Sequence, residues 1–253
     1  MGASPSSSSA APGAWSGQAR LGLGWGEFVG ISGDNAPHSH HAVQVILSEH
    51  PQPLWTAEAG WLDVRGAVIG PELPHQLGTH GEPVRLLYIE PHSHSGRRLM
   101  AAGRGLRVLG DEECAAALQA LTRAASPDVA LADALAPATT EGLPLKGDPD
   151  IEAWIAALPV ALPDGLTAET CAQQLHLSRS RFLHRFSAHT GLPLRPYLRW
   201  RRLLLAMREV MQGHSLTEAA HAAGFADAAH FSRTFRRHFG LVPSALVGMA
   251  ATT

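Results

Sequence analysis

Residues 215–240 read SLTEAAHAAGFADAAHFSRTFRRHFG, and this stretch decides the fold of the C-terminal part of the chain. Ser215 and Glu218 have the spacing of a capping box, in which two side chains satisfy free N–H groups at a helix start. Gly224 suits the left-handed conformation that ends a helix, and Asp227 suits the cap of the next one. The pattern therefore predicts two short helices joined by a tight turn.

The second of these helices is predicted to run from Ala228 to His238. Phe231 and Phe235 lie four residues apart, so they share one face and anchor it in a core, while Phe225 plugs the corner between the helices. Two helices joined in this way, with small Ala residues where they pack closely, are typical of a helix-turn-helix. The second helix of such a unit enters the major groove of DNA, which is wide enough for one helix.

The same plan occurs about fifty residues earlier, over 167–191. A cap, a buried face, a corner residue, a second cap and a Phe-anchored helix follow one another in the same order. Matched positions are 48 apart before the turn and 49 apart after it, so the second turn is one residue longer. The matched pairs are Thr167/Ser215, Ala172/Ala220, Leu177/Phe225, Phe182/Phe231 and Gly191/Gly240. The chain is therefore predicted to hold two copies of one helix-turn-helix unit.

The outer faces of the two second helices carry the predicted DNA contacts. An Arg side chain can bond a guanine edge twice, which is worth about 1–3 kcal/mol of discrimination, whereas Ala and Leu can only meet thymine methyl groups or fill space. The predicted base-reading residues are Arg179, Ser180, Leu183 and His184 in the first copy and Ala228, Ala229, His230 and Arg233 in the second. The predicted phosphate contacts, which position the protein without reading sequence, are Ser178, Arg185, Arg236 and Arg237.

One long amphipathic helix is predicted between the copies, over 193–212. It would hold the two reading helices at a fixed separation. Two such helices on one face of B-DNA must lie one helical turn, about 10 base pairs, apart. The residues expected on its inner face are Tyr197, Leu198, Leu204, Leu205 and Val210.

Charge is distributed unevenly along the chain. Residues 164–253 hold 11 Arg and 5 acidic residues, a net charge of +6, whereas residues 1–163 hold 9 basic and 17 acidic residues, a net charge of −8. A basic segment on an acidic body is the electrostatic footprint of nucleic-acid binding, although charge alone leaves a solvated basic face as an equal alternative. A generic helical bundle is the alternative for the Phe pattern, and two copies in register with matching caps disfavour it.

Residues 164–246 resemble the DNA-binding domain of the AraC/XylS family of bacterial transcription regulators, over about a third of the chain. That family's second unit has the signature I-A-x-x-x-G-F-x-[DS]-x-S-x-F-x-R-x-F-[KR]-[KR]-x-x-G-x-x-P. The residues that meet it are Ala220, Gly224, Phe225, Asp227, Phe231, Arg233, Phe235, Arg236, Arg237, Gly240 and Pro243. The chain departs from the family pattern at two positions. His176 stands where the first unit often has its turn glycine, and Ala229 replaces the usual Ser, which removes one phosphate or base contact.

The N-terminal part has a different pattern. Residues 20–100 hold short strand-like segments separated by Gly and Pro, of which the strongest are His38–Leu47, Trp61–Val68 and Val84–Ile89. Such spacing predicts an all-β barrel or sandwich. The predicted fold therefore has two domains, an N-terminal all-β barrel or sandwich and a C-terminal all-α domain with two helix-turn-helix motifs. The predicted divisions are a disordered tail (1–16), the barrel (17–105), a helical linker (106–149) and the helix-turn-helix domain (150–248).

Histidine is abundant in this chain, with 15 residues. Alternation along the strand HSHHAVQVIL puts His38, His40 and Gln44 on one face, and the stretch GPELPH ends at His75 in a Pro-bounded turn. These two stretches resemble the motif regions of a small cupin barrel, the common effector domain of AraC-family regulators. The four residues are therefore the candidate effector or metal ligands.

A metal-binding cupin brings together two or three His and a carboxylate, a set that suits Fe, Mn, Ni or Zn. Here the expected Glu position holds Gln44, and the loss of this anion weakens the case for tight metal binding and for catalysis. For these side chains we therefore favour hydrogen bonds within the barrel or contact with an organic effector. The prediction requires no cofactor, and binding of a divalent metal ion is the alternative. His80, His92 and His94 are expected to be surface residues in loops.

The helical linker is rich in Ala and Leu. Exposed Leu118 and Leu121 would mark a homodimer face, although packing within one chain explains them equally well. Two Cys are too few for a disulfide framework, which fits a reducing cytoplasm, and the start of the sequence lacks the pattern of a secretory signal. We also expect no membrane contact, because no apolar stretch approaches the roughly 20 residues of a membrane span.

The leading hypothesis is a cytoplasmic, sequence-specific transcription regulator, not an enzyme, that reads two consecutive major grooves of double-stranded DNA. A small-molecule effector in the cupin-like domain would bias DNA occupancy, and RNA polymerase would be a partner of an activator. Two rivals stay open: a metal-dependent cupin enzyme with an appended DNA-binding domain, and a metal-responsive repressor that uses the same His set without chemistry.

Overall fold

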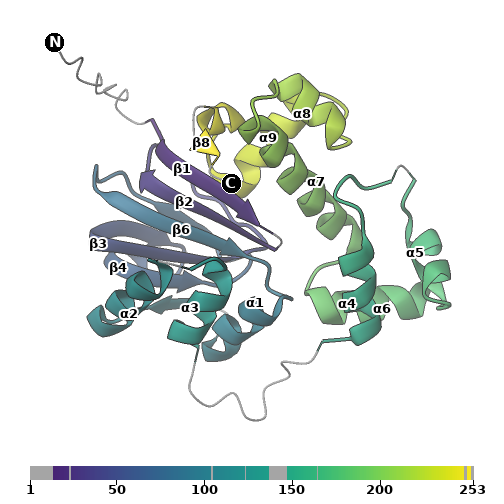
Figure 1. Ribbon diagram of the computed structural model, residues 1–253, viewed down its shortest axis with the longest axis horizontal. Helices are drawn as coiled ribbons and strands as arrows, with labels where there is room; N and C mark the ends of the chain where they lie inside the picture. The colour runs from purple at the N-terminus through teal and green to yellow at the C-terminus, as the bar shows by residue number, and fades with distance from the viewer. Residues whose placement is uncertain are drawn as a thin grey trace.

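The N-terminal half of the chain is built around one sheet (Figure 1). The computed structural model describes residues 14–22, 24–103, 105–122, 124–136, 147–163, 165–247 and 250–251. In this described part, eight strands pair in the order β7-β4-β3-β6-β2-β1-β8, with β5 also paired to β3. The strands are β1 (Ser16–Gly22), β2 (Trp25–Ile31), β3 (Val43–Thr56), β4 (Gly60–Ile69), β5 (His75–Leu77), β6 (Pro83–Ile89), β7 (Leu106–Val108) and β8 (Ala250–Ala251). Every described pair is antiparallel except β1 with β8.

Strand β3 lies at the centre of the sheet and is buried on both faces. Its first half pairs with β4 on one side and with β6 on the other. Because side chains alternate along a strand, Ile46 packs into one core while Val45 and Leu47 pack into a second core on the opposite face. The register shifts between Leu47 and Gln52, where a bulge lets the long strand bend.

One face of the sheet is covered by helices of the same domain. These are α1 (His94–Leu99), with the 3₁₀ turn η1 (Met100–Ala102), α2 (Asp111–Leu121) and α3 (Pro127–Leu135). Leu121 is 3% exposed and Leu118 packs at the edge of the same core. The predicted linker is thus wrong over 106–135, because β7 joins the sheet and α2 and α3 bury their apolar sides against it. Residues 137–146 of the linker lie outside the described residues.

The C-terminal half is helical and holds both predicted helix-turn-helix units. Its helices are α4 (Pro149–Ala157), α5 (Ala168–Gln174), α6 (Arg179–Thr190), α7 (Leu194–Met211), α8 (Leu216–Ala222), α9 (Ala228–Phe239) and the 3₁₀ turn η2 (Pro243–Leu246). The predicted caps are confirmed, since the side chains of Thr167, Ser178, Ser215 and Asp227 accept N-cap hydrogen bonds at α5, α6, α8 and α9. The predicted two-domain architecture is confirmed as well.

Both units turn at a residue with left-handed backbone. This residue is His176 (φ 53°) in the first unit and Gly224 (φ 72°) in the second. The turn between α5 and α6 spans 175–178, and the turn between α8 and α9 spans 223–227, so the second is one residue longer, as predicted. Each reading helix then ends at a left-handed glycine, Gly191 or Gly240.

Helix α7 divides its apolar residues between two cores. Its first half, including Tyr197, packs with α4, α5 and α6. Its second half, from Trp200 to Val210, shares a core with α9 and with one face of the sheet. The second helix-turn-helix unit is therefore built onto the sheet, whereas the first packs on α4.

Three details of the N-terminal domain differ from the prediction. Trp15 packs edge-on against Phe28, with ring centroids 5.2 Å apart, so the end of the predicted tail belongs to the fold, while residues 1–13 lie outside the described part. Strand β3 starts at Val43, because residues 38–42 leave the sheet, and within them a backbone bridge pairs His38 with His75. In the described part no pairing joins the edge strands β7 and β8, so the sheet is open where a closed barrel was expected.

Candidate functional site

The first reading helix, α6, presents most of its predicted DNA face to solvent. Arg179, Ser180 and His184 are exposed, as is the cap residue Ser178. Leu183 is half-buried at the edge of the core beneath α6, so it contributes less to the outer face than predicted. The first unit therefore offers a polar reading edge with one apolar side.

Two arginines of α6 are engaged with acids. Arg179 Nε lies 2.5 Å from Glu169 Oε1, and both side chains are mostly exposed, so this pair is weak and can be displaced. Arg185 bonds both carboxylate oxygens of Asp148, at 2.5 and 2.6 Å, and its Nη2 also donates to Asp150 at 2.7 Å. Arg185 thus joins α6 to the start of α4.

The Arg185 ion pairs compete with the predicted phosphate contact of this residue. Asp148 also caps α4, and its hydrogen bonds from Arg185 hold the pKa of the carboxyl below its ordinary value. Two carboxylates neutralise this guanidinium and take up its Nε and Nη2 donors, so a phosphate oxygen would have to compete with them. The partners are 37 residues apart in the chain, so no local pattern could reveal them.

The second reading helix, α9, carries basic groups that are not paired with acids. Arg233, Arg236 and Arg237 are exposed, and in the described part of the chain none of them takes part in a salt bridge. Ala229 and His230 are also exposed. Helix α9 begins at Ala228, directly after the N-cap residue Asp227. The predicted base-reading and phosphate residues of the second unit are therefore accessible, except that Ala228 is half-buried.

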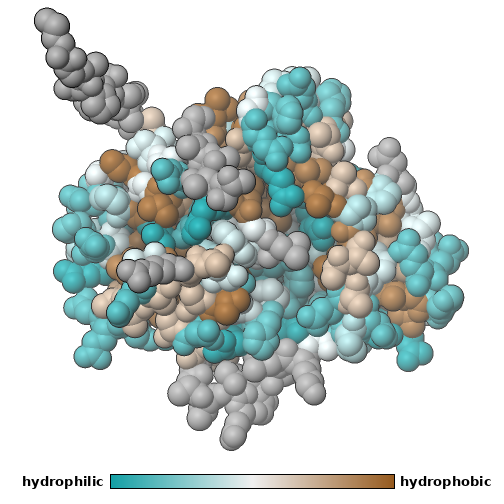
Figure 2. All heavy atoms as spheres, viewed as in Figure 1, coloured by the Kyte–Doolittle hydropathy of each residue, from teal (hydrophilic) through white to brown (hydrophobic). Residues whose placement is uncertain are grey.

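The two reading helices lie at opposite ends of α7 (Figure 1). The surface over α8 and along the right-hand edge of the molecule is mostly hydrophilic (Figure 2). The prediction missed Arg181, which is exposed on α6 three residues before His184. The helical spacing of those two residues was the signal that could have found it.

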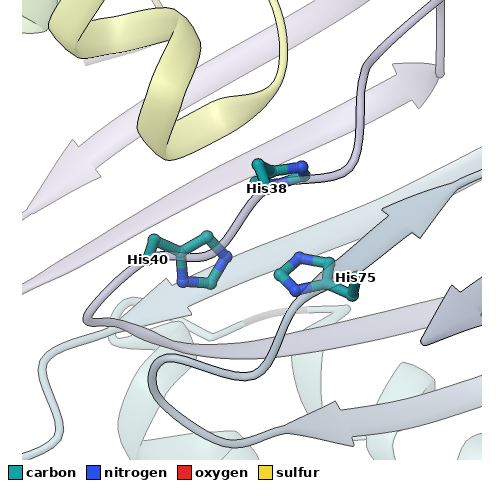
Figure 3. A group of neighbouring side chains, drawn as sticks. All are labelled: His38, His40 and His75. Carbon is teal, nitrogen blue, oxygen red and sulfur yellow. The ribbon is translucent and has the colours of Figure 1, made fainter. Parts of the chain in front are cut away.

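Three imidazoles form a cluster where the sheet meets α9 (Figure 3). His38 and His40 come from the segment before β3, and His75 starts β5. One ring nitrogen from each lies within 4.8 Å of the other two. His40 and His75 are both 1% exposed. The structure thus brings together three of the four residues proposed as effector or metal ligands, and Gln44 lies beside them.

Backbone carbonyl groups fix the orientation of all three rings. The Nδ1 atoms of His38, His40 and His75 lie 2.9, 3.0 and 2.8 Å from the carbonyl oxygens of Ala36, Ala42 and Leu73, respectively. A carbonyl oxygen only accepts hydrogen bonds, so each Nδ1 carries the hydrogen and donates it. In a neutral ring the other nitrogen, Nε2, then holds a lone pair.

Gln44 lies between two of these lone pairs. Its amide, measured to Oε1, is 2.9 Å from Nε2 of His40 and 2.8 Å from Nε2 of His75. Since an amide's oxygen and nitrogen are assigned from such networks, we place the NH₂ group here, where it donates to both rings. Nε2 of His38 is buried and has no hydrogen-bond partner among the described residues.

All three rings are neutral near pH 7. Burial, with a contribution from His75, lowers the pKa of His38 to about 4. Burial also lowers the pKa of His40 well below 6.5 and lowers the pKa of His75. Neutral imidazoles whose Nδ1–H groups are held by carbonyls are the usual ligands of divalent transition metals. The three rings are therefore of the kind that binds such an ion, but in this arrangement the Gln44 NH₂ group occupies the Nε2 lone pairs of His40 and His75.

A further histidine group, at the boundary between the domains, was not predicted. His92 is 7% exposed and its Nε2 lies 3.0 Å from Glu90 Oε2, so the expectation of a surface residue is wrong. The chain leaving β6 runs beneath α6, where His92 meets His189 with ring centroids 5.7 Å apart. His94 is exposed but belongs to α1, and His80 is exposed.

A small apolar cavity also lies between the sheet and the helical domain. Its volume is about 80 Å³. Aromatic side chains dominate its lining, among them Trp25, Phe28, Tyr88, Trp200 and Phe239.

The comparisons with known proteins agree with this geometry in the helical domain. Residues 171–248 match the family described as a helix-turn-helix domain. Over 105 residues the chain is 39% identical to the HTH-type transcriptional activator RhaS of Salmonella arizonae and 38% identical to that of Salmonella paratyphi B. Each match covers 39% of this chain and only 37% of the relative.

Solved structures resemble nearly the whole chain in fold. An apo ToxT variant from Vibrio cholerae superposes with a TM-score of 0.61 at 12% identity, over 92% of this chain and 100% of that one. ToxT bound to an unsaturated fatty acid gives 0.53 at 11% identity, over 90% and 97%. At such low identity these matches establish the fold alone.

The fold and the paired units define a two-domain protein with a double helix-turn-helix. By these matches the helical domain is similar to the helix-turn-helix domain of the RhaS activators, and the arrangement of that domain with a sheet-rich N-terminal domain resembles the fold of ToxT. Among the helices that the structure describes, none has the length and apolar character needed to cross a bilayer.

Proposed function

We propose that this chain is a sequence-specific DNA-binding transcription regulator. One observation carries the proposal: two helices, each with a side-chain N-cap, two Phe anchors and a left-handed glycine at the end, present basic outer faces from the two ends of α7. Helix α7 has 18 residues, which at about 1.5 Å per residue gives a rod of about 27 Å. This length suits two reading helices that enter consecutive major grooves about 34 Å apart.

In this proposal the second unit makes the stronger contacts. Arg233 reads a base edge, and Arg236 and Arg237 bind phosphates, because all three are exposed and unpaired with acids in the described structure. Ala229 and His230 complete the reading edge, with Ala228 contributing its exposed part. Thymine methyl groups are the natural partners of the two alanines.

The first unit reads through Arg179, Ser180 and His184, with Leu183 as an apolar neighbour. Ser178 lies at the helix start, where backbone N–H groups favour a phosphate. We assign the phosphate contact first expected of Arg185 to Arg181, since Arg185 is bound by Asp148 and Asp150.

The N-terminal domain is proposed to sense a small ligand and to bias DNA occupancy. The curated relatives matched over the helical domain are named transcriptional activators, so we extend activation, with RNA polymerase as partner, to this chain. A solved ToxT structure holds an unsaturated fatty acid. In this chain the apolar cavity and the histidine cluster are both candidate ligand sites.

Catalysis by the cluster is the less favoured candidate. Among the described residues, no carboxylate joins the three histidines, so the group lacks both an anionic ligand and a nearby general base. A homodimer is not required for two-groove reading, because one chain carries both reading helices.

Selection of bound sequences from a random double-stranded DNA pool tests the proposal on the full chain. We expect a recovered motif with two elements about one helical turn apart. An Arg233→Ala variant should lose one element and an Arg179→Ala variant should weaken the other. Recovery of no motif, or of a motif that neither variant changes, would overturn the proposal.

A further inference from the structure

We infer that two adjoining hollows at the boundary between the domains bind a small organic acid with at least two carboxylates and a hydroxyl group. The larger hollow has a volume of about 620 Å³ and the smaller one about 280 Å³, and His41 and Glu72 line both. Clefts between domains are frequent places for small ligands. The site itself does not depend on the proposed DNA-binding function, whereas its effect on DNA binding rests on that function.

His41 offers two hydrogen-bonding atoms to the hollows. The residue is 5% exposed, and neither ring nitrogen has a hydrogen-bond partner of normal geometry among the described residues, although the backbone of Thr190 is close. Its Nδ1 lies 3.9 Å from Glu72 Oε1, which is too far for a hydrogen bond. Burial, together with the nearby His92, lowers the pKa of His41 to about 4, so near pH 7 the neutral ring has one N–H and one lone pair. Leaving both unsatisfied is costly, and a ligand that pairs them recovers this cost.

A second buried imidazole lines the larger hollow. His92 is 7% exposed, and its Nδ1 also has no hydrogen-bond partner in the part of the chain that the structure describes. Its Nε2 donates to Glu90 Oε2 at 3.0 Å, so in the neutral ring Nδ1 holds a lone pair. An ionised carboxylate has no hydrogen to give to a lone pair, but a hydroxyl group has one. The ligand should therefore carry a hydroxyl beside its acidic groups.

The larger hollow also holds an arginine in a fixed position. Helices α1 and α6, which carry Arg97 and His189, lie on the two sides of the domain boundary (Figure 1). Nδ1 of His189 accepts the backbone N–H of Asp148 at 2.9 Å, so Nε2 carries the hydrogen of the neutral ring. Arg97 Nη2 lies 3.2 Å from both ring nitrogens, which places the guanidinium over the face of the ring. Arg97 is thus positioned at the wall of the hollow.

Two further arginines line the smaller hollow. Arg199 of α7 and Arg237 of α9 are exposed, and within the described residues neither takes part in a salt bridge. Together the two hollows are lined by four arginines and two carboxylates, a net charge of +2. One of these carboxylates, Asp148, is already bound by Arg185, which leaves Glu72 to oppose the other three cations.

The placement of the cations selects the class of ligand. Arginine lies in both hollows, on either side of the shared His41, so a ligand with separated negative charges fits better than a single phosphate group. Hydrogen bonds between guanidinium and carboxylate are charge-assisted and strong. In the bound state one carboxylate pairs with Arg97 and another with Arg199 and Arg237, while a hydroxyl donates to an imidazole lone pair. Citrate carries all of these groups and serves as the probe.

Isothermal titration calorimetry of the full chain with citrate, at pH 7 and constant ionic strength, tests the site. We expect one saturable equivalent. Arg199→Gln and Arg237→Gln should each weaken citrate binding at least fivefold, because each removes a cation of the smaller hollow. Arg195→Gln and Arg236→Gln are the matched controls and should bind citrate as the parent does. They remove the same charge from exposed positions on the same helices, and these positions line neither hollow.

Two more measurements address the imidazoles. Tricarballylate, which is citrate without the hydroxyl group, should bind at least fivefold more weakly than citrate. His41→Phe, which removes both ring nitrogens, should weaken citrate binding at least tenfold, and the arginine pairs decide the matter if this buried variant does not fold. Equal binding of the two acids overturns the assignment of the hydroxyl. No saturable citrate binding, or equal losses in Arg237→Gln and Arg236→Gln, overturns the site.

The place of Arg237 predicts an effect on DNA binding. Under the proposed function Arg237 binds a DNA phosphate, and citrate would compete for the same guanidinium. Fluorescence anisotropy with the selected DNA, at constant ionic strength, should therefore show at least threefold weaker binding at saturating citrate, and Arg237→Gln should abolish this difference. Unchanged DNA affinity with citrate bound overturns this effect alone. Absence of DNA binding with and without citrate overturns the proposed function, while calorimetry still decides the site.

Discussion

The two helix-turn-helix units share one plan, yet different neighbours hold them. The first packs on α4 around Phe182 and Phe186, and Arg185 ties it to the start of that helix. The second shares a core with the sheet, and its last residue bonds the segment that carries the histidine cluster. A repeated sequence therefore built two units with one local structure and two different mechanical connections.

The arginines of the two units also differ in whether they are paired with acidic residues. On α6, two of the predicted contacts, Arg179 and Arg185, already bind acids. On α9, Arg233, Arg236 and Arg237 make no salt bridge within the described residues. The second unit should therefore contribute more of the DNA affinity and should be the one that the N-terminal domain influences.

The largest expected effects come from truncating the Phe anchors. Phe186→Ala and Phe235→Ala should each lower the free energy of unfolding by about 3–5 kcal/mol, because both rings are almost fully buried. Phe235→Ala should also speed amide exchange in β1, β2 and β6, since its core includes the sheet, whereas Phe186→Ala should not. Hydrogen-exchange mass spectrometry distinguishes them, and equal opening of the sheet in both variants would contradict the assignment of cores.

Acidification should weaken the contacts of His189 in α6 with His92 and with the backbone N–H of Asp148. Burial, with help from Arg97, lowers the pKa of His189 to about 4, and the group faces His92 and the backbone N–H of Asp148. The unfolded chain has the ordinary pKa of about 6.5, so it binds more protons than the folded chain between pH 6.5 and 4. Stability should therefore fall as pH drops through this window.

Urea unfolding at pH 7, 6 and 5 measures this dependence. His189→Gln should make it shallower by the share of one imidazole, since other buried histidines such as His38 still contribute, and His184→Gln is the exposed control on the same helix. If His189→Gln keeps the pH profile of the parent, other groups cause the pH dependence of the free energy of unfolding.

A smaller effect is expected on sequence discrimination. Arg233→Ala should cost about 1–3 kcal/mol in specific binding and little in non-specific binding, because it removes a base contact. Arg179→Ala should cost less, since Arg179 must first leave Glu169. The ratio of specific to non-specific Kd, measured at one salt concentration, reports both, and a larger loss for Arg179→Ala would reverse the ranking of the units.

Phosphate contacts give the next prediction. Arg236→Ala should reduce the slope of log K against log salt by about 0.9 and leave the thermal midpoint unchanged, because Arg236 is exposed. Arg185→Ala should do the opposite, lowering the thermal midpoint with no change of slope, since its partners are Asp148 and Asp150. A reduced salt slope in Arg185→Ala would restore it as a phosphate contact.

The smallest effect concerns the turn residues. His176 and Gly224 occupy equivalent left-handed positions, which glycine adopts at lower cost. His176→Gly should raise the free energy of unfolding by up to about 1 kcal/mol, and Gly224→Ala should lower it by a similar amount. Thermal or urea unfolding at pH 7 measures both, and destabilisation by His176→Gly would mean that its side chain makes a contact worth more than the backbone strain.

The sequence predicted what depends on neighbours within a few positions. The capping residues, the longer second turn and the buried Phe pairs all follow from local spacing, and the structure contains each of them. The left-handed backbone of His176 followed from the family pattern, which often has a turn glycine there. The convergence of His38, His40 and His75 was predicted from a family resemblance. The hydrogen bonds from their Nδ1 atoms to backbone carbonyl groups were not predicted.

The features that could not be predicted depend on residues brought together by the fold. Arg185 meets Asp148 across 37 positions. Leu121 is buried because α2 packs on the sheet, and His92 is buried because the chain passes under α6. Periodicity marks which side of an element is apolar, but it does not say which other element will cover that side.

The shared core also determines how the protein can be divided for experiments. A recombinant fragment cut at residue 150, the boundary suggested by the sequence, would lack Asp148, which both caps α4 and holds Arg185. It would also expose to water the faces of Trp200 and Phe239 that the sheet covers. Such a fragment should be prone to aggregation and poorly folded at its N-terminal end. A fragment of the helical part for crystallisation or binding studies should therefore begin upstream of Asp148 and carry polar residues in place of these two aromatic ones.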